Sequence, residues 1–308
     1  MSVVSIVIPC YRSAASLEEL VARLLKVSAD LRRDFEIILV DDRSPDETWA
    51  VAQRLKAEHG APLKIVRLLK NSGQHNALLC GLHVASGEIV VTMDDDLQNP
   101  PEEIPKLIAA LESGYDLAIG AYERKEHPAA RNFGGELIDR LLRGIFKLPA
   151  EFQLTSFRAV RRVVVENACR MSGVFPYLTA MLLSHTSNPV NVPVRHEPRR
   201  HGRSGYTLRR SFSLAANLIL NYSSWPLYLV GALCLAAFCF SLGFGAWVLI
   251  RALLHDTSVP GWASTVVIIS FFNALTLLCL YVFGLYLSRL NLQLTRTATH
   301  FTISEQQH

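Results

Sequence analysis

Short apolar runs alternate with longer amphipathic stretches over residues 1–120. The runs with the length and composition of buried strands are 3–8, 35–40, 63–68, 89–93 and 116–120. The first helix is expected over 16–31, where Ser16 and Glu19 have the spacing of a capping box. This regular alternation predicts a doubly wound α/β sheet of mostly parallel strands.

The middle of the chain has two further amphipathic stretches. Residues 127–146 have a basic, amphipathic helical pattern, which is typical both of a helix in a membrane interface and of a surface helix on a domain core. A strand-like segment follows at 154–158, and another is expected at 190–194. Residues 206–224 form the second amphipathic stretch, which we expect to run along a membrane surface.

Two long apolar spans, 225–250 and 263–287, contain no Asp, Glu, Lys or Arg. Each exceeds the roughly 20 residues that a bilayer-spanning helix needs. A short link joins them and arginines flank them, so we expect a two-helix transmembrane hairpin with both ends in the cytoplasm. The expected organisation is a cytoplasmic catalytic domain at 1–205, a juxtamembrane helix at 206–224, the hairpin at 225–288 and a cytoplasmic tail at 289–308.

Composition adds limits to this picture. The hydrophobic content of 50% and the mean hydropathy of +0.23 are high for a soluble protein, and the excess is concentrated in the two spans. The net charge of +4 does not indicate nucleic-acid binding, and the basic residues before the first span are better placed for anionic lipid headgroups. The first residues lack the pattern of a signal peptide. The six cysteines have neither zinc nor disulfide spacing.

The most informative stretch is GEIVVTMDDDLQNPPEEIP at 87–105. Asp94, Asp95 and Asp96 directly follow a strand, where open α/β sheets bind ligands. Asp94 and Asp96 alternate along an extended chain and can therefore face one ligand together. With the amide of Gln98, these hard oxygen donors suit Mg²⁺ or Mn²⁺ shared with a diphosphate. The alternative is a solvated acidic turn.

Two other strand ends are expected at the same edge of the sheet. Tyr11 follows the first strand and can stack on a base, although a packed aromatic at a strand end is an equally common alternative. Asp42 follows the second strand and can accept a hydrogen bond from a base N–H. No G-x-G-x-x-G motif is present, which argues against a dinucleotide site of the dehydrogenase kind. The edge therefore suits a nucleotide diphosphate.

Nearly the whole chain resembles the inverting, metal-dependent glycosyltransferases of family 2, of the polyprenyl-phosphate type. The stretches that carry the resemblance are SIVIPCYRSAASL, EIILVDDRSPDET, NSGQHNALLCGL, LTSFRAVRR and RRHGRSGYTLRR, together with the acidic stretch above. NSGQH and DLQNPPEEIP are most similar to the bacterial members that transfer 4-deoxy-4-formamido-arabinose to undecaprenyl phosphate. The resemblance implies a GT-A-like catalytic domain.

The resemblance also implies roles for individual positions. The nucleotide base and ribose would be held by Pro9, Tyr11, Val40 and Asp42. Mg²⁺ or Mn²⁺ would be bound by Asp94, Asp96 and Gln98, with Asp95 beside the sugar diphosphate. The lipid phosphate would be met by Arg131, Ser156, Arg158 and Arg199, with Gly202 and Ser204 in the loop of R-x-x-G-x-S.

Four positions, in three motifs, depart from the family pattern. Arg12-Ser13 stands where Asn-Glu often follows the Tyr of the first motif, and Gly205 replaces a Lys found in some members. Ser156 stands where some bacterial members have an Asp proposed as a base. A phosphate monoester has a second pKa of about 6, so the acceptor does not need a strong base.

The expected reaction transfers a sugar from a nucleotide sugar, with UDP favoured over GDP, to undecaprenyl phosphate. The expected location is the bacterial inner membrane, with a homotetramer suggested by the resemblance. Two alternatives remain: a transferase that acts on a protein or polysaccharide, and a non-catalytic membrane scaffold that binds nucleotide sugars. A processive synthase would carry a Q-x-x-R-W motif, which the sequence lacks.

Overall fold

The structure is a computed structural model. It describes residues 3–122, 133–171, 176–198, 262–295 and 301–307, and a few positions between 229 and 243. The chain divides into two compact units. The first consists of Met1–Ala215 and Arg296–His308, and the second of Ala216–Thr295.

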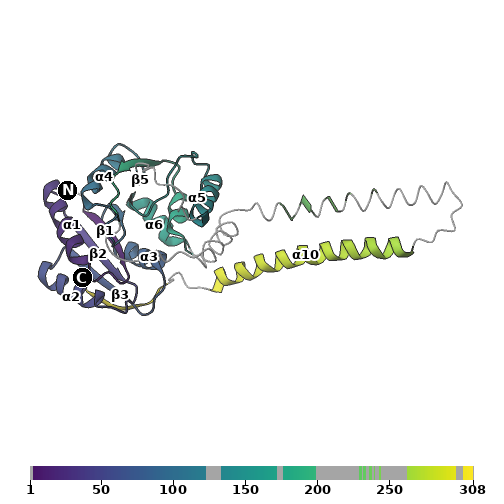
Figure 1. The fold of residues 1–308 in the computed structure, drawn as a ribbon, viewed down its shortest axis with the longest axis horizontal. Helices are drawn as coiled ribbons and strands as arrows, with labels where there is room; N and C mark the ends of the chain where they lie inside the picture. The colour runs from purple at the N-terminus through teal and green to yellow at the C-terminus, as the bar shows by residue number, and fades with distance from the viewer. Residues whose placement is uncertain are drawn as a thin grey trace. The chain divides into compact units, whose positions relative to one another are not determined.

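The first unit is built on an eight-stranded sheet in the order β7-β5-β6-β4-β1-β2-β3-β8 (Figure 1). The strands are β1 (Val4–Cys10), β2 (Phe35–Asp41), β3 (Leu63–Leu68), β4 (Ile89–Thr92), β5 (Leu117–Tyr122), β6 (Arg158–Arg161), β7 (Pro189–Val194) and β8 (Ile303–Gln307). Neighbours are parallel in four pairs, β1–β2, β1–β4, β2–β3 and β5–β7. They are antiparallel in β3–β8, β4–β6 and β5–β6. The predicted α/β sheet is confirmed, as a mixed sheet.

Helices pack on both faces of this sheet. The helices of this unit are α1 (Leu17–Leu31), α2 (Thr48–His59), α3 (Gln74–Val84), α4 (Ile104–Glu112) after the 3₁₀ turn η1 (Pro101–Glu103), α5 (Phe133–Phe146), α6 (Arg162–Arg170) and α7 (Leu178–Leu183). Helices α1, α2 and α4 share a core with Ile6, Ile37 and Leu39. Helix α3 packs closely against β1 at Gly81, where a Cβ would lie 2.3 Å from a methyl group of Val7. Because both faces are covered, β1 and β2 are buried along their whole length.

The amino end of the sheet contains a buried polar cluster around Glu36. Its carboxylate accepts hydrogen bonds from the side chains of Ser5 and Lys64, and from the N–H and hydroxyl of Ser86, both at 2.8 Å. Burial by itself would raise the pKa of Glu36, but these hydrogen bonds outweigh it and lower the pKa to about 2. The cluster therefore ties three strands to the turn before β4.

Three local predictions are corrected. No capping box forms at Ser16, whose hydroxyl donates to the carbonyl of Ser13, because a turn closed by that carbonyl already starts the helix. The strand expected at 154–158 lies instead at Arg158–Arg161, where it pairs with β4 and β5. The last residues, expected as a tail, contain β8, which pairs with β3 (Figure 1).

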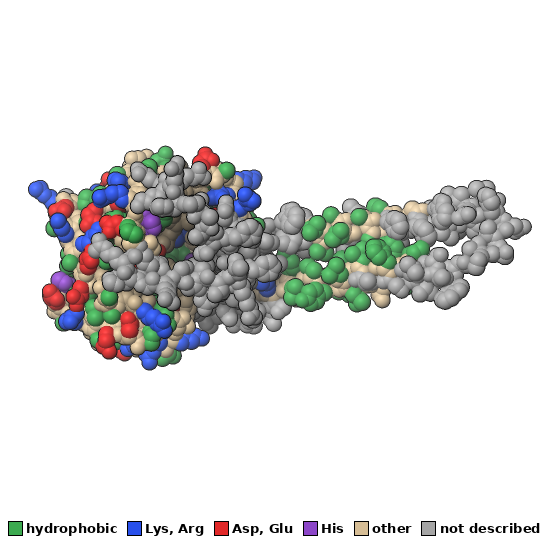
Figure 2. All heavy atoms as spheres, in the orientation of Figure 1, with side chains coloured by type: hydrophobic (Ala, Val, Ile, Leu, Met, Phe, Trp, Pro, Cys, Tyr) green, Lys and Arg blue, Asp and Glu red, His purple; other side chains and the backbone are tan. Residues whose placement is uncertain are grey.

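The second unit contains helix α10 (Trp262–Thr295), which covers the second predicted span. Large apolar side chains such as Phe271 and Tyr281 are exposed on it, and Figure 2 shows apolar side chains gathered along this helix. Within the described ranges, no helix combines the length and apolar content needed to cross a membrane. Nearly all of 225–250, and all of the helix expected at 206–224, lie outside the described residues.

The amphipathic stretch expected at 127–146 is a helix from Phe133 onward, namely α5. Leu142 on this helix is completely buried, and Arg143 donates to the carbonyl of Phe152 at 3.1 Å. These contacts anchor the C-terminal half of α5 to the rest of the first unit.

Candidate active site

The carboxyl ends of β4, β1 and β2 lie side by side in the sheet. The N–H of Asp42 donates to the carbonyl of Cys10 at 2.9 Å, and the N–H of Met93 donates to the carbonyl of Val7 at 3.3 Å. The loops that carry Tyr11, Asp42 and the three aspartates therefore meet at one edge, as the sequence predicts.

Asp95 joins two of these loops. Its carboxylate accepts hydrogen bonds from the hydroxyl of Ser13 and from the N–H of Tyr11, the latter at 3.2 Å. Burial, and to a smaller extent the adjacent carboxylates, raise the pKa of Asp95, whereas the two hydrogen bonds lower it; together these effects place the pKa at about 6. The Asp95 carboxylate therefore lies against the loop after β1, which contains Tyr11 and Ser13.

Asp94 is held by residues from two other elements. Gln74, the first residue of α3, donates its amide to Oδ1 at 2.6 Å, and Ser156 donates its hydroxyl to Oδ2. Asp96 accepts from the N–H of Gln98 at 3.1 Å. Gln74 belongs to NSGQH, one of the stretches that carry the family resemblance, but no role was predicted for it from the sequence.

Leu97 gives the acidic loop its shape. Its backbone has φ 61°, a left-handed conformation that is uncommon for a branched side chain, and its side chain is buried. Leu97 is buried between Asp96 and Gln98, which are both partly exposed. The strain is therefore located within the predicted metal-binding loop.

Asp42 is buried, and both its oxygens accept backbone hydrogen bonds, from the N–H of Ser72 at 2.6 Å and of Gly73 at 2.8 Å. Burial raises the pKa of Asp42, and these two hydrogen bonds act against the shift. Each carboxylate oxygen has two lone pairs, so a base N–H can still be accepted. Asp42 also fixes the start of α3.

The other predicted nucleotide-binding residues differ in exposure. Tyr11 is 44% exposed, with the guanidinium of Arg12 lying 5.5 Å from its ring centre, so it is not a packed strand-end aromatic. Pro9 is buried. Val40 is also buried, and its side chain faces α3 near Gly81, so only its backbone can contribute to the site.

Arg158 lies behind Ser156 and is almost completely buried. Its guanidinium donates to the hydroxyl of Thr179 at 3.0 Å and to the carbonyl of Ser156 at 3.3 Å. Burial lowers the pKa of Arg158, while Tyr177 and Asp94 nearby favour its charged form. The site therefore has a fixed cation beneath its acidic loop.

Two aromatic rings lie beside the acidic loop. Neither was predicted from the sequence to belong to the site. The rings of Tyr122 and His196 lie 4.0 Å apart, and the Tyr122 hydroxyl donates to Asn99 at 2.8 Å. The N–H of Glu197 donates to the carbonyl of Gln98 at 2.9 Å. Residues 195–198, which follow β7 and are called its extension below, therefore lie along the predicted metal-binding loop.

The predicted residues Arg131, Arg199, Gly202 and Ser204 lie outside the described residues. In the ranges that the structure does describe, no three His, Cys, Asp or Glu side chains are grouped as a metal site. Asp94, Asp96 and Gln98 provide two carboxylates and one amide. This small oxygen donor set fits Mg²⁺ or Mn²⁺, which are commonly held by one or two carboxylates plus substrate phosphates and water.

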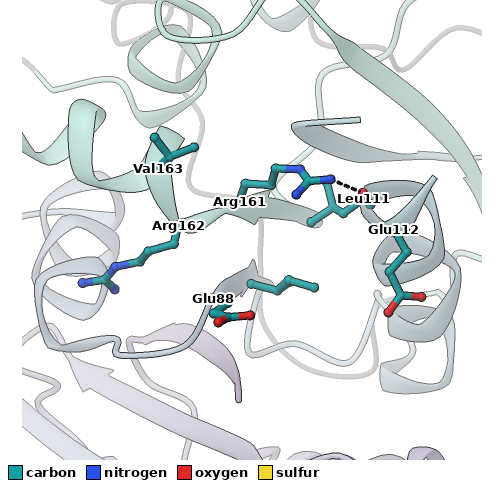
Figure 3. A pocket seen from close by; sticks show the side chains of 7 residues that line it. Glu88, Leu111, Glu112, Arg161, Arg162 and Val163 are labelled. Atoms are coloured by element: carbon teal, nitrogen blue, oxygen red, sulfur yellow. Dashed lines mark hydrogen bonds between the residues drawn. The ribbon is translucent and has the colours of Figure 1, made fainter. Parts of the chain in front are cut away.

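A separate cavity of about 380 Å³ lies at the opposite end of β4. Figure 3 shows it between Glu88, Glu112 and Arg161, with Arg161 bonded to the carbonyl of Leu111 at 2.6 Å. Glu88 directly precedes β4, whereas Asp94 follows it, so the strand separates this cavity from the acidic edge.

The comparisons with known proteins agree with this fold. Residues 5–168 match the family described as Glycosyl transferase family 2. The undecaprenyl-phosphate 4-deoxy-4-formamido-L-arabinose transferase of Pseudomonas aeruginosa (strain LESB58) is 33% identical over 302 residues, covering 94% of this chain and 86% of the relative. The enzyme of that name from Enterobacter sp. (strain 638) is 31% identical over 261 residues. This match covers 85% of this chain and 79% of the Enterobacter enzyme.

Solved structures share the fold. Glucosyl-3-phosphoglycerate synthase from Mycobacterium tuberculosis, in complex with Mn²⁺, UDP and phosphoglyceric acid, has a TM-score of 0.52 at 22% identity and covers 71% of this chain and 76% of its own. Mannosyl-3-phosphoglycerate synthase from Rubrobacter xylanophilus has a TM-score of 0.52 at 20% identity. The match covers 71% of this chain and 72% of the synthase chain. The fold is therefore GT-A-like, and the protein is a glycosyltransferase. The chain belongs to glycosyl transferase family 2.

Proposed function

We propose that the protein transfers a sugar from a UDP-sugar to the phosphate of undecaprenyl phosphate, with inversion at the anomeric carbon. The observation that carries the proposal is the hydrogen bond from the N–H of the exposed Tyr11 to Asp95, which joins the loop after β1 to the acidic loop that carries Asp94 and Asp96. It occurs in a chain that is similar over most of its length to enzymes named for sugar transfer to this lipid.

The donor side uses the three loops of this edge. Tyr11 stacks on the base, Asp42 accepts from it, and Asp94, Asp96 and Gln98 hold Mg²⁺ or Mn²⁺. The bound ion would neutralise charge on the leaving diphosphate. A GT-A-like neighbour solved with Mn²⁺ and UDP is consistent with this choice of ligands. A GDP-sugar is the competing donor for the same edge.

The acceptor side needs cations more than a base. The lipid phosphate is largely a dianion at neutral pH, so its oxygen can attack the anomeric carbon directly as the bond to the diphosphate breaks. Arg131 and Arg199 would orient this phosphate. Arg158 is buried, so we assign it an electrostatic effect across Ser156 and not direct contact.

We further propose that residues 225–288 attach the protein to the bacterial inner membrane as a two-helix hairpin, with the catalytic unit in the cytoplasm. The uninterrupted apolar sequence of the two spans and the arginines around them support this. Assembly as a homotetramer is part of the same proposal and rests on the family resemblance.

The direct test incubates membranes that contain the protein with labelled UDP- and GDP-sugars, undecaprenyl phosphate and Mg²⁺ or Mn²⁺. We expect label in the organic extract with a UDP-sugar, and at least a hundredfold less with Asp96→Asn. Transfer from a GDP-sugar alone would overturn the donor assignment. Label in protein or polysaccharide, or none in any acceptor, would overturn the proposed reaction.

A further inference from the structure

The two oxygens of the Asp94 carboxylate are held separately by two side chains from outside the acidic loop. Gln74 binds one oxygen and Ser156 binds the other. We propose that Gln74 and Ser156 are positioning residues that hold Asp94 in the orientation in which it receives the divalent metal ion. This inference rests on the metal site of the proposed function and adds two residues that act on it through Asp94.

The Gln74 contact has a fixed origin. Gln74 begins α3, and the two residues before it donate their N–H groups to Asp42. Gly73 has φ 88°, a conformation that glycine adopts without steric cost, which allows the chain to turn from Asp42 into the helix. Three consecutive residues therefore connect the base-binding Asp42 to Asp94.

The Ser156 contact is fixed by β4, the strand that precedes Asp94. Thr92, the last residue of β4, donates its hydroxyl to the carbonyl of Ser156 at 2.8 Å. The guanidinium of Arg158 donates to the same carbonyl, and Thr92 is the register partner of Arg158. Thus Ser156 and Asp94 are placed by one pair of strands, which leaves the hydroxyl little freedom to move away.

This geometry leaves Asp94 able to bind a cation. A carboxylate oxygen has two lone pairs, so an oxygen that accepts one hydrogen bond can still coordinate metal. Carboxylates that bind metals are generally oriented by such partners, whose loss costs about 10–100-fold in metal affinity or activity. The same geometry commits the Ser156 hydroxyl to Asp94, so that Ser156 replaces the family's Asp as a structural donor and not as a base.

The test measures Mn²⁺ binding to the full chain in detergent, by the electron paramagnetic resonance signal of free Mn²⁺, with and without UDP. We expect Gln74→Ala and Ser156→Ala each to raise the Mn²⁺ Kd about 10–100-fold. Ser156→Thr retains a hydroxyl and should restore binding. Gln53→Ala and Ser113→Ala, which remove side chains of the same kind without a bond to Asp94, are the matched controls.

The kinetic readout separates positioning from general damage. We expect kcat to fall with the loss of metal affinity, while the KM for the lipid stays within about twofold, because the Ser156 hydroxyl is bonded to Asp94 and, in this proposal, does not contact the lipid phosphate to which the family resemblance assigned it. Gln74 is exposed, so Gln74→Ala removes no packed side chain and tests the proposal even if Ser156→Ala does not fold.

The outcomes distinguish the inference from the function on which it rests. If Asp94→Asn weakens Mn²⁺ binding but Gln74→Ala and Ser156→Ala do not, the positioning role is refuted and the metal site stands. If Asp94→Asn itself leaves Mn²⁺ binding unchanged, the metal assignment and this inference both fall. Weaker binding in all three variants, with rescue by Ser156→Thr, supports both.

Discussion

The hydroxyl of Ser13 donates a hydrogen bond to the carboxylate of Asp95, which joins the loop after β1 to the loop after β4. The N–H of Ser13 in turn donates to the hydroxyl of Thr48 at 2.8 Å, so the serine is held from two sides. Tyr11, two residues earlier, donates its N–H to the same carboxylate. Tyr11, which we propose stacks on the nucleotide base, is therefore positioned by the acidic loop.

Ser13→Ala should weaken nucleotide binding. It removes a hydrogen bond to a charged group, worth about 1.5–3 kcal/mol, although the N–H of Tyr11 remains to satisfy the carboxylate. We expect the KM for the nucleotide sugar to rise about tenfold and the KM for the lipid to stay unchanged in steady-state assays. Ser113→Ala is the control, and an equal rise in both KM values would contradict a role in the donor site.

Glu36→Gln should destabilise the catalytic unit at neutral pH but hardly at all in acid. The pKa of Glu36 is about 2 in the folded protein against an ordinary value of 4.5, so its stabilisation is fully present above pH 4.5 and is lost as the pH falls toward 2. We expect a loss on the order of 2 kcal/mol at pH 7, after allowing for solvent screening at the partly exposed Lys64.

Thermal unfolding of the wild-type protein and the variant at pH 7 and pH 3 measures this difference. The gap between their unfolding temperatures should be several degrees at pH 7 and should fall to less than half of that at pH 3, because Glu36 in the folded protein loses its charge only near pH 2. A gap that does not change with pH would mean that Glu36 contributes by packing and not by its charge.

Gly81→Ala should lower stability because helix α3 has no space for a methyl group there. A Cβ at position 81 would lie 2.3 Å from a Val7 methyl and 3.2 Å from one of Val40. Overpacking of this kind costs about 1–3 kcal/mol, which a lower thermal unfolding temperature would report. The double variant with Val7→Ala should recover part of the loss.

Gly144→Ala is the matched control for this prediction. Gly144 also lies within a helix, but its Cβ would meet nothing within 4 Å. Alanine should therefore be neutral there, or stabilising by up to about 1 kcal/mol through its higher helix propensity. Equal destabilisation by both substitutions would show that close packing is not the cause.

Glu103→Gln should loosen the extension of β7. Glu103 is buried and accepts hydrogen bonds from Lys106 and from Arg195, the latter at 2.6 Å. We expect at least tenfold faster hydrogen exchange at the N–H of Glu197, which bonds to Gln98. Lys106→Met keeps the contact with Arg195 and should leave this exchange nearly unchanged. If Lys106→Met has the same effect, the contact with Arg195 does not hold the segment.

The order and type of the main elements could be predicted because they depend on local patterns. β1 and β2 are apolar at nearly every position, which is how strands covered on both faces appear in a sequence. The antiparallel strands could not be placed in this way. β8 is exposed at all five residues, so it lacks an apolar pattern and is defined by its pairing with β3.

The acidic edge could be predicted in part, because carboxylates that follow strands gather at one end of the sheet. The meeting of Tyr11, Asp42 and Asp95 is confirmed. Gln74 and His196 could not be assigned, since their proximity to the acidic loop depends on how α3 and β7 pack and not on a spacing in the sequence. The burial of Arg158 depends on packing in the same way.

The pairing of β8 with β3 makes the catalytic unit discontinuous along the chain. It is assembled from Met1–Ala215 and Arg296–His308, and the second unit is an insertion between them. A fragment cut after Ala215 would lack one strand and leave the edge of β3 open to pairing with other molecules. A minimal catalytic fragment should instead join the two segments through a short flexible connector that replaces the inserted unit.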